Sequence, residues 1–383
     1  MKSKVALIRC NQYDPHEVKE AIKRGIALLG GISTFMKPGE SILLKPNVLV
    51  GDNPDKVITT HPIVFQAIAE LFKEKGADLF YGDSPAMGKP ERHLKQGGYK
   101  EFADALGIRL ADFQTPIKVS FPNALLAKQL YLAQGAIDAH GIISICKLKT
   151  HAFTRITGAV KNQFGCIPGL RKAEYHVKMP DVFDFARLLV DINSYLKSRL
   201  RLFVMDGIVA MEGNGPRGGD PVPMNVLLFS TDPVALDSVV CRLIDLNPEF
   251  VPTLKFGEEG GLGKYKTEDI EHVGDEIESF IKHDFKIVRQ APDRLASSRS
   301  FPTFLKNFVS PRPEIDYNRC VNCGSCVLQC PVNPKAVNWP FNDKKKKPVY
   351  DYKKCIRCYC CQEICPEKAI AIKTPFLGRL IHK

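Results

Sequence analysis

The chain has 383 residues, of which 44% are hydrophobic, enough for a large core and two or three domains. No run approaches the ~18 continuous apolar residues of a membrane-spanning helix, and the net charge of +12 is not accompanied by the interleaved aromatic residues of single-strand binders. We therefore expect no membrane span and no nucleic acid partner. Thirteen cysteines without a recognisable signal peptide favour metal ligation over disulfides, which predicts a cytoplasmic location.

Residues 1–290 alternate strand-like and helix-like runs, which predicts an α/β fold with a largely parallel sheet and flanking helices. Strands are expected at residues 5–8, 41–44, 78–81, 141–145, 202–205 and 226–229. Helices are expected at residues 15–29, 62–75, 91–106, 181–196 and 232–244, with Thr60 capping the second. Residues 291–312, where Ser, Pro and Arg replace any periodicity, are expected to be a linker to a small α+β domain at residues 313–383.

Polar side chains follow four of the predicted strands. Ligands of open α/β sheets bind outside the carboxyl ends of the strands, so these side chains are expected to share an anion- or metal-binding cleft. Taken singly, each is typical of a solvated or capping residue. The residues that we expect to bind the substrate are Lys45, Asn47, Lys147, Lys149, Lys161, Asn162, Glu212 and Asn214.

Within that cleft, Lys147, Lys149 and Lys161 would form a cationic wall suited to a carboxylate or phosphate, which makes an anionic small molecule the expected substrate. The candidates for proton transfer are His151, Asp83 and Asp206. Neither a G-x-G-x-x-G dinucleotide fingerprint nor a P-loop is present.

The C-terminal segment carries the motif C-x2-C-x2-C-x3-C-P twice. This spacing is typical of two-cluster bacterial ferredoxins, in which the fourth cysteine of each run ligates the other cluster. It predicts two [4Fe–4S] clusters, although two structural zinc ions are an alternative. One ligand set is Cys320, Cys323, Cys326 and Cys365, and the other is Cys355, Cys358, Cys361 and Cys330.

The remaining cysteines are expected to be non-ligands. Cys360 lies between cluster ligands, whereas four isolated cysteines are expected to be small buried hydrophobic residues, namely Cys10, Cys146, Cys166 and Cys241. The lysine run at residues 344–347 is typical of a solvated loop, and the alternative is a docking site for an acidic redox partner protein.

Several long runs resemble the domain-of-unknown-function 362 family, many of whose members have a C-terminal ferredoxin module. These runs are LLKPN from Leu43, TTHP from Thr59, GDSP from Gly82, KLKTH from Lys147, TGAVKNQFGC from Thr157, DGIVAMEGNGP from Asp206 and DPVALD from Asp232. The resemblance covers residues 1–290 and implies an iron–sulfur protein, but it assigns no reaction. A remoter likeness is to the lactate-racemase-type fold with its nickel-pincer cofactor, from which no nickel ligand is carried over.

Together these features predict an iron–sulfur electron-transfer protein, possessing a ferredoxin-type module and an α/β domain that binds an anionic small molecule. One alternative is a non-catalytic electron carrier or adaptor that docks a partner oxidoreductase. A second alternative is an isomerase-like enzyme with a metal cofactor, in which the clusters are structural.

Overall fold

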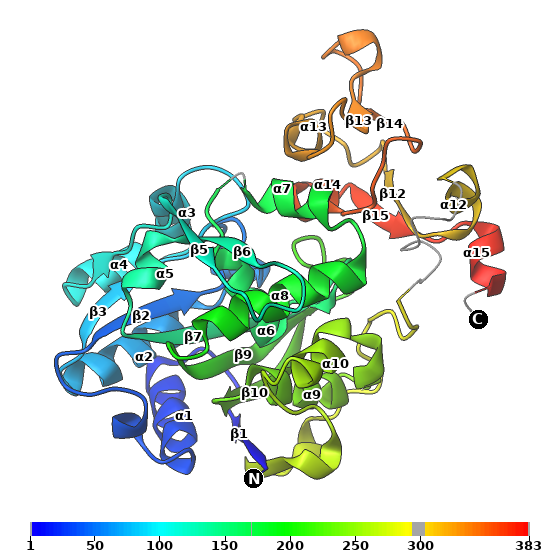
Figure 1. Ribbon diagram of the computed structural model, residues 1–383. Coiled ribbons are helices and arrows are strands. Elements are labelled where there is room, and N and C mark those ends of the chain that lie inside the picture. Colours follow the sequence, from blue (N-terminus) through cyan, green and yellow to red (C-terminus); the bar gives the residue numbers. More distant parts are fainter. Residues whose placement is uncertain (1, 170, 293–302, 382–383) are drawn as a thin grey trace.

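The structure, a computed structural model, describes residues 2–169, 171–292 and 303–381. Within these residues a nine-stranded mixed sheet forms the centre of the N-terminal domain, in the order β11-β1-β10-β9-β7-β2-β3-β4, with β8 paired to β7 (Figure 1). Its strands are β1 (Ser3–Arg9), β2 (Ser41–Pro46), β3 (Asp78–Tyr81), β4 (Arg109–Leu110), β7 (Gly141–His151), β8 (Arg155–Ile156), β9 (Leu200–Glu212), β10 (Asp220–Ser230) and β11 (Ile270–Gly274). Strands β9, β7, β2, β3 and β4 are parallel, whereas β10 is antiparallel to both neighbours.

Helices cover both faces of this sheet, and a separate hairpin is formed by β5 (Pro116–Ser120) and β6 (Gln129–Ala133). The helices are α1 (Pro15–Leu28), α2 (Pro62–Glu74), α3 (Pro90–Gln96), α4 (Tyr99–Ala105), α5 (Gln134–Asp138), α6 (Gly158–Asn162), α7 (Arg171–Lys178), α8 (Val182–Leu196), α9 (Pro233–Leu243) and α10 (Pro252–Glu259). Of the helices in the three described ranges, none combines the length and the apolar content that crossing a membrane would require.

The alternation of side chains along β7 shows how the two faces are filled. Ile143 and Ile145 pack into a core with α1, α2 and α4, whereas Ile142, Cys146 and Leu148 pack into a second core with α6, α8 and α9. Successive residues of a strand point to opposite faces, so a continuous apolar strand is required wherever both faces are covered. The predicted α/β class with a largely parallel sheet is confirmed.

Two local predictions differ from the structure. Residues 91–106 form two helices instead of one, because Gly98 adopts a left-handed conformation (φ 79°) between α3 and α4. Thr60 does not cap α2; the N-cap is His61, whose side chain accepts a hydrogen bond from the Ile63 N–H. The Thr60 hydroxyl instead donates to the Ile145 carbonyl, which ties the start of α2 to β7.

The C-terminal module consists of short elements. They are α12 (Thr303–Val309), β12 (Arg312–Ile315), α13 (Ser325–Gln329), β13 (Val337–Asn338), β14 (Val349–Tyr350), α14 (Cys360–Ile364), β15 (Ile370–Lys373) and α15 (Phe376–Ile381). Strand β12 pairs with β15, and β13 pairs with β14. The division at residues 291–312 stays a prediction: helix α12 lies inside this range, and residues 293–302 lie outside the described residues.

Candidate functional site

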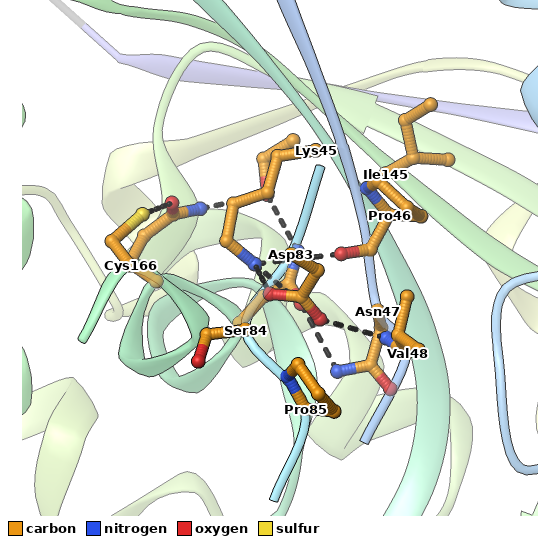
Figure 2. A network of polar contacts seen from close by, with 12 residues as sticks. Lys45, Pro46, Asn47, Val48, Asp83, Ser84, Pro85, Ile145 and Cys166 are labelled. Carbon is orange, nitrogen blue, oxygen red and sulfur yellow. Dashed lines mark hydrogen bonds and ion pairs between the residues drawn. The ribbon is translucent and has the colours of Figure 1, made fainter. Parts of the chain in front are cut away.

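The carboxyl ends of β2 and β3 are joined by a buried ion pair (Figure 2). Lys45 Nζ lies 2.8 Å from Asp83 Oδ1, and the other oxygen of Asp83 accepts a hydrogen bond from the Val48 N–H at 2.9 Å. Gly165 lies so close to this pair that an added Cβ would be 1.9 Å from Asp83 Oδ1. Both charged side chains are thus neutralised by each other, buried, and covered by Gly165, so their positions in the site are fixed.

A chain of amide groups extends from this pair. Asn47 Nδ2 donates to Asn162 Oδ1 at 3.0 Å, and Asn162 Nδ2 donates in turn to Ser144 Oγ at 2.9 Å. The two asparagines come from the end of β2 and from α6, whereas Ser144 lies on β7. These bonds fix the orientation of both side chains at the same edge of the sheet, as the sequence predicted for a shared cleft.

A cavity of about 60 Å³ opens beside these amides. A water molecule needs roughly 10–15 Å³ of such space, so the cavity suits a ligand of the size of a carboxylate or phosphate group. Its walls come from both parts of the chain: strand ends, α6 and α7 on one side, α13 and α14 of the C-terminal module on the other. Among its lining residues are Asn47, Asp83, Lys149, Thr157, Lys161, Asn162, Lys172, His176, Gln329, Cys360 and Glu363.

Three lysines of this cavity, Lys149, Lys161 and Lys172, have no carboxylate within ion-pair distance among the described residues. Burial lowers the pKa of each ammonium group, and it lowers that of Lys172 to about 7. Lys149 donates to the Ile58 carbonyl, and Lys172 donates to the carbonyls of Ser84 and Pro85. Buried cations without a counter-ion are costly, so an anionic ligand would complete the charge balance of the cavity.

Buried polar atoms without partners line the same cavity. Asn47 Oδ1, Thr157 Oγ1 and His176 Nδ1 are buried and make no hydrogen bond within the described structure. Such atoms are rare in folded proteins, because each costs about 1–3 kcal/mol when left unpaired. The Thr157 hydroxyl and the His176 imidazole, which lie in the same cavity as the three lysines, can donate hydrogen bonds to the oxygen atoms of a small anion, whereas Asn47 Oδ1 and the Glu363 carboxylate can only accept them.

A second buried ion pair, between two residues of the predicted cleft, lies elsewhere. Lys147 Nζ is 2.8 Å from Asp206 Oδ2, and both side chains are buried. Asp206 also accepts hydrogen bonds from the Tyr13 hydroxyl and from the His61 and Ile208 N–H groups. Together with Lys147, these donors make four hydrogen bonds, which fill the acceptor sites of the Asp206 carboxylate. Neither Lys147 nor Asp206 lines the cavity. The sequence grouped these two residues with the cleft, but the fold separates them from it.

His151 links the two domains. Its Nδ1 accepts hydrogen bonds from the Phe153 and Thr154 N–H groups, and its Nε2 lies 3.0 Å from Glu363 Oε1 on α14. Burial lowers the pKa of His151 to about 4, so the ring is neutral near pH 7 and carries its proton on Nε2. The neutral imidazole therefore faces the Glu363 carboxylate where α14 meets the end of β7.

The two predicted residues at and after the end of β9, Glu212 and Asn214, contact other groups and do not line the cavity. Asn214 Nδ2 donates to the Ile370 carbonyl, and Gln362 Nε2 donates to Asn214 Oδ1, both at 2.9 Å. Glu212 accepts a hydrogen bond from the Lys286 N–H at 2.8 Å. Of the predicted polar set, the cavity is lined by Asn47, Asp83, Lys149, Lys161 and Asn162, with Lys45 behind them.

The eight motif cysteines surround two small cavities in the module. One is lined by Cys320, Cys323, Cys326 and Cys365, and the other by Cys330, Cys355, Cys358 and Cys361. These sets are the two that the crossed ferredoxin spacing predicts. In each motif two residues with positive φ turn the loop around its cavity, namely Asn322 and Gly324, then Arg357 and Tyr359.

The donor chemistry of these sets fits iron–sulfur clusters. Backbone N–H groups of Ala336 and Ala369 donate to the sulfurs of Cys330 and Cys365 at 3.4 and 3.3 Å, and such bonds stabilise thiolate ligands. Four thiolates around each cavity are the ligand set of a [4Fe–4S] cluster, which is the cofactor that the spacing of the two motifs predicts.

Cys360 lines neither cysteine-lined cavity and instead lines the cavity beside Lys161. The four isolated cysteines are buried, as predicted. Sequence reasoning missed Lys172, His176 and Glu363. The first two lie on α7, a short and mostly polar helix that was not predicted, and the third lies between cysteine ligands.

Comparison with known families supports both halves of this description. The model of the domain of unknown function DUF362 matches residues 42–242, and that of a 4Fe-4S dicluster domain matches residues 312–366. The chain belongs to the DUF362 family. Its C-terminal module is a 4Fe–4S ferredoxin-like domain, which gives this DUF362 chain the capacity for iron–sulfur electron transfer.

A curated relative of this DUF362 chain is the thylakoid-associated protein sll1697 of Synechocystis sp., 36% identical over 263 residues that cover 68% of this chain and 81% of the relative. Two solved structures share part of the fold. The lactate racemase apoprotein from Thermoanaerobacterium thermosaccharolyticum matches with a TM-score of 0.40, 11% identity and coverage of 62% of this chain. A protein from Thermotoga maritima matches with a TM-score of 0.36, 12% identity and coverage of 59%. The alignments span only 56% and 57% of those two chains.

Proposed function

We propose that the DUF362 domain binds a small oxyanion in the cavity between the two domains, and that the C-terminal module exchanges electrons with it through two [4Fe–4S] clusters. The observation that carries this proposal is that residues of both domains line the cavity. Cys360 and Glu363, which lie between cysteine ligands of the second motif, line the same cavity as Lys149 and Lys161. The binding site and one cysteine set are therefore lined by neighbouring residues of the same loop, with Cys360 at the cavity and Cys361 in the set.

The residues of the cavity have distinct tasks in this proposal. Lys149, Lys161 and Lys172 bind and orient the anion, while Thr157 Oγ1 and His176 Nδ1 complete its hydrogen bonds. Asp83, which borders the cavity, is the member of the predicted proton-transfer set that we assign to that role. When bound, the clusters supply single electrons, and covalent linkage keeps them at a high effective concentration beside the anion.

Lys161 provides the direct test. Lys161→Gln removes an unpaired charge from the cavity, so we expect anion affinity to fall about 10- to 100-fold, as for the loss of a charged hydrogen bond. Thermal unfolding of anaerobic protein with phosphate and small carboxylates would measure this, since a bound anion raises the unfolding temperature. Lys178→Gln, on the exposed end of α7, is the matched control and should behave like the wild type.

Reoxidation of the reduced module by candidate anions, followed through its visible absorbance, completes this test. If every anion reoxidises the reduced Lys161→Gln variant as fast as it reoxidises the wild type, the proposal of an enzyme that acts on an anion is wrong. The alternative of a non-catalytic electron carrier then stands. If no anion stabilises the wild type, the cavity is not an anion site.

Anion binding should also depend on pH through Lys172. Its pKa of about 7 means that the ammonium is charged below this pH and neutral above it. We therefore expect affinity to weaken as pH rises through about 7 to 8, with the midpoint shifted upwards because a bound anion stabilises the charged form. The groups that face Lys172 are Asp83, Lys45, Lys161 and Cys166. Calorimetric titration of phosphate or a carboxylate between pH 6 and 9, a range that includes the pKa of Lys172, would measure the change in affinity. The Lys172→Met variant should show a weaker dependence of affinity on pH.

A further inference from the structure

The two cysteine sets have different surroundings. In the second motif Cys358 and Cys361 are buried, and Tyr359 between them packs against Phe153 of the DUF362 domain, with ring centroids 6.2 Å apart. In the first motif Cys323 is exposed and Val321 beside it is 62% exposed. The second set therefore faces the anion cavity, and the first faces the surface of the molecule.

A surface of mixed apolar and basic character lies around the exposed cysteine. We call it the outer face and define it by Val321, Cys323, Phe341 and residues 344–346. Phe341 is 94% exposed, and the three lysines of the run are exposed and form no ion pair with a described carboxylate. Figure 1 shows this segment, in orange, at the end of the module turned away from the DUF362 domain.

Hydrogen bonds hold the lysine segment beside the first motif. Asn322 Nδ2 donates to the Lys344 carbonyl at 2.7 Å, and Trp339 Nε1 donates to Asn322 Oδ1 at 2.9 Å. Pro348, which follows the lysine run, lines the cavity of the first cysteine set. Lys346 Nζ lies 5.5 Å from the centre of the Phe341 ring. The lysines are thus attached to the loop that carries Cys323.

We propose that the outer face is the docking surface for an acidic electron-carrier protein, which exchanges electrons with the module at the first cysteine set. This inference rests on the proposed function, because it assigns the two sets to opposite ends of one electron path. The basic residues match an acidic partner, while Val321 and Phe341 supply the apolar centre that a transient interface needs.

The position of the outer face, around the exposed Cys323, favours an electron-carrier protein as the partner. A surface wrapped around a cysteine ligand is where a carrier must approach, because an electron donor has to come close to its acceptor. Exposed lysines raise the rate of encounter with an acidic protein, and this attraction is screened by salt over about 10 Å at 0.1 M ionic strength. An anionic membrane surface would also attract lysines and an exposed Phe, and it is a separate outcome of the test.

The test measures binding and needs no catalytic activity. The full-length anaerobic protein is titrated with an oxidised plant-type [2Fe–2S] ferredoxin and with an oxidised flavodoxin of acidic composition, at low and high salt. Replacing Lys344, Lys345 and Lys346 with Glu should weaken binding at low salt by at least about tenfold, and Phe341→Ser should weaken it without changing the salt dependence. A control with the same net charge replaces Lys37, Lys73 and Lys75, which are exposed near the opposite edge of the sheet.

Several results would overturn the proposal. They are an absence of wild-type binding to both carriers at low salt, equal weakening by the control, and no effect of the Lys344–346 variant. Tighter binding to vesicles of anionic phospholipid than to either carrier would assign the face to a membrane instead. Iron content and visible absorbance should be the same in all variants. Because carrier binding does not involve Lys161, its failure and the failure of anion binding are seen in different experiments.

Discussion

Replacing Asp206 with leucine should destabilise the folded protein by about 3–5 kcal/mol, the usual cost of removing one partner of a buried ion pair. The carboxylate accepts hydrogen bonds from Lys147, Tyr13 and two backbone N–H groups, and all four would lose this acceptor. Lys147 Nζ would keep only its hydrogen bond to the Tyr13 hydroxyl. Lys147 is 1% exposed and has no route to water without opening the end of β7. Urea unfolding followed by circular dichroism would measure the loss.

Two further variants separate the cause of this effect. Lys147→Met combined with Asp206→Leu removes both charges, so the double variant should be more stable than Asp206→Leu alone. Asp78→Leu breaks the exposed pair with Arg109 and should cost less than about 1 kcal/mol. A double variant no more stable than the single one would show that packing, and not an unpaired charge, controls this position.

Pairs of cysteine substitutions should reveal the crossed ligand sets. Two [4Fe–4S] clusters contain about eight iron ions, so the loss of one leaves about four. Cys320→Ala with Cys365→Ala affects a single set and should leave about four iron ions per chain, because both cysteines line the same cavity. Cys355→Ala with Cys365→Ala affects both sets and should leave almost none.

Anaerobic iron and acid-labile sulfide analysis checks this pattern. An uncrossed arrangement would give the reverse result, because Cys355 and Cys365 belong to the same sequence motif. Cys360→Ala is the matched control and should retain the full iron content, since Cys360 lines neither cysteine cavity. Zinc in place of iron in the wild type would contradict the assignment of these sets to iron–sulfur clusters.

Six strands of the nine-stranded sheet could be predicted from the sequence because apolar runs are local signals, whereas the short β4, β8 and β11 were not predicted. The full length of β7 could not be predicted. The run was expected to end at Ile145, yet the strand continues through Lys147 and Lys149 to His151. These polar side chains are tolerated inside because distant groups satisfy them, Asp206 for the first and the Ile58 carbonyl for the second. Such pairings depend on tertiary structure and leave no local pattern.

The cavity was predictable only in part. Strand-end residues such as Asn47 and Asp83 could be grouped because parallel strands end at one edge. The separation of Asp206 from that group follows from its position deeper in the sheet, opposite Lys147. The contribution of the C-terminal module to the cavity could not be predicted. Glu363 lies between two predicted cluster ligands, and nothing in that motif indicates a second role for the residues between its cysteines.

The shared wall of the cavity has a consequence for variants of the cysteine ligands. Cys360 and Glu363 belong to residues 355–365, which also carry four of the predicted cluster ligands, so the cavity and the two cysteine sets share one segment of backbone. We therefore expect that substitutions of Cys358 or Cys361 also disturb the contact of Glu363 with His151 and the wall of the cavity beside Lys161.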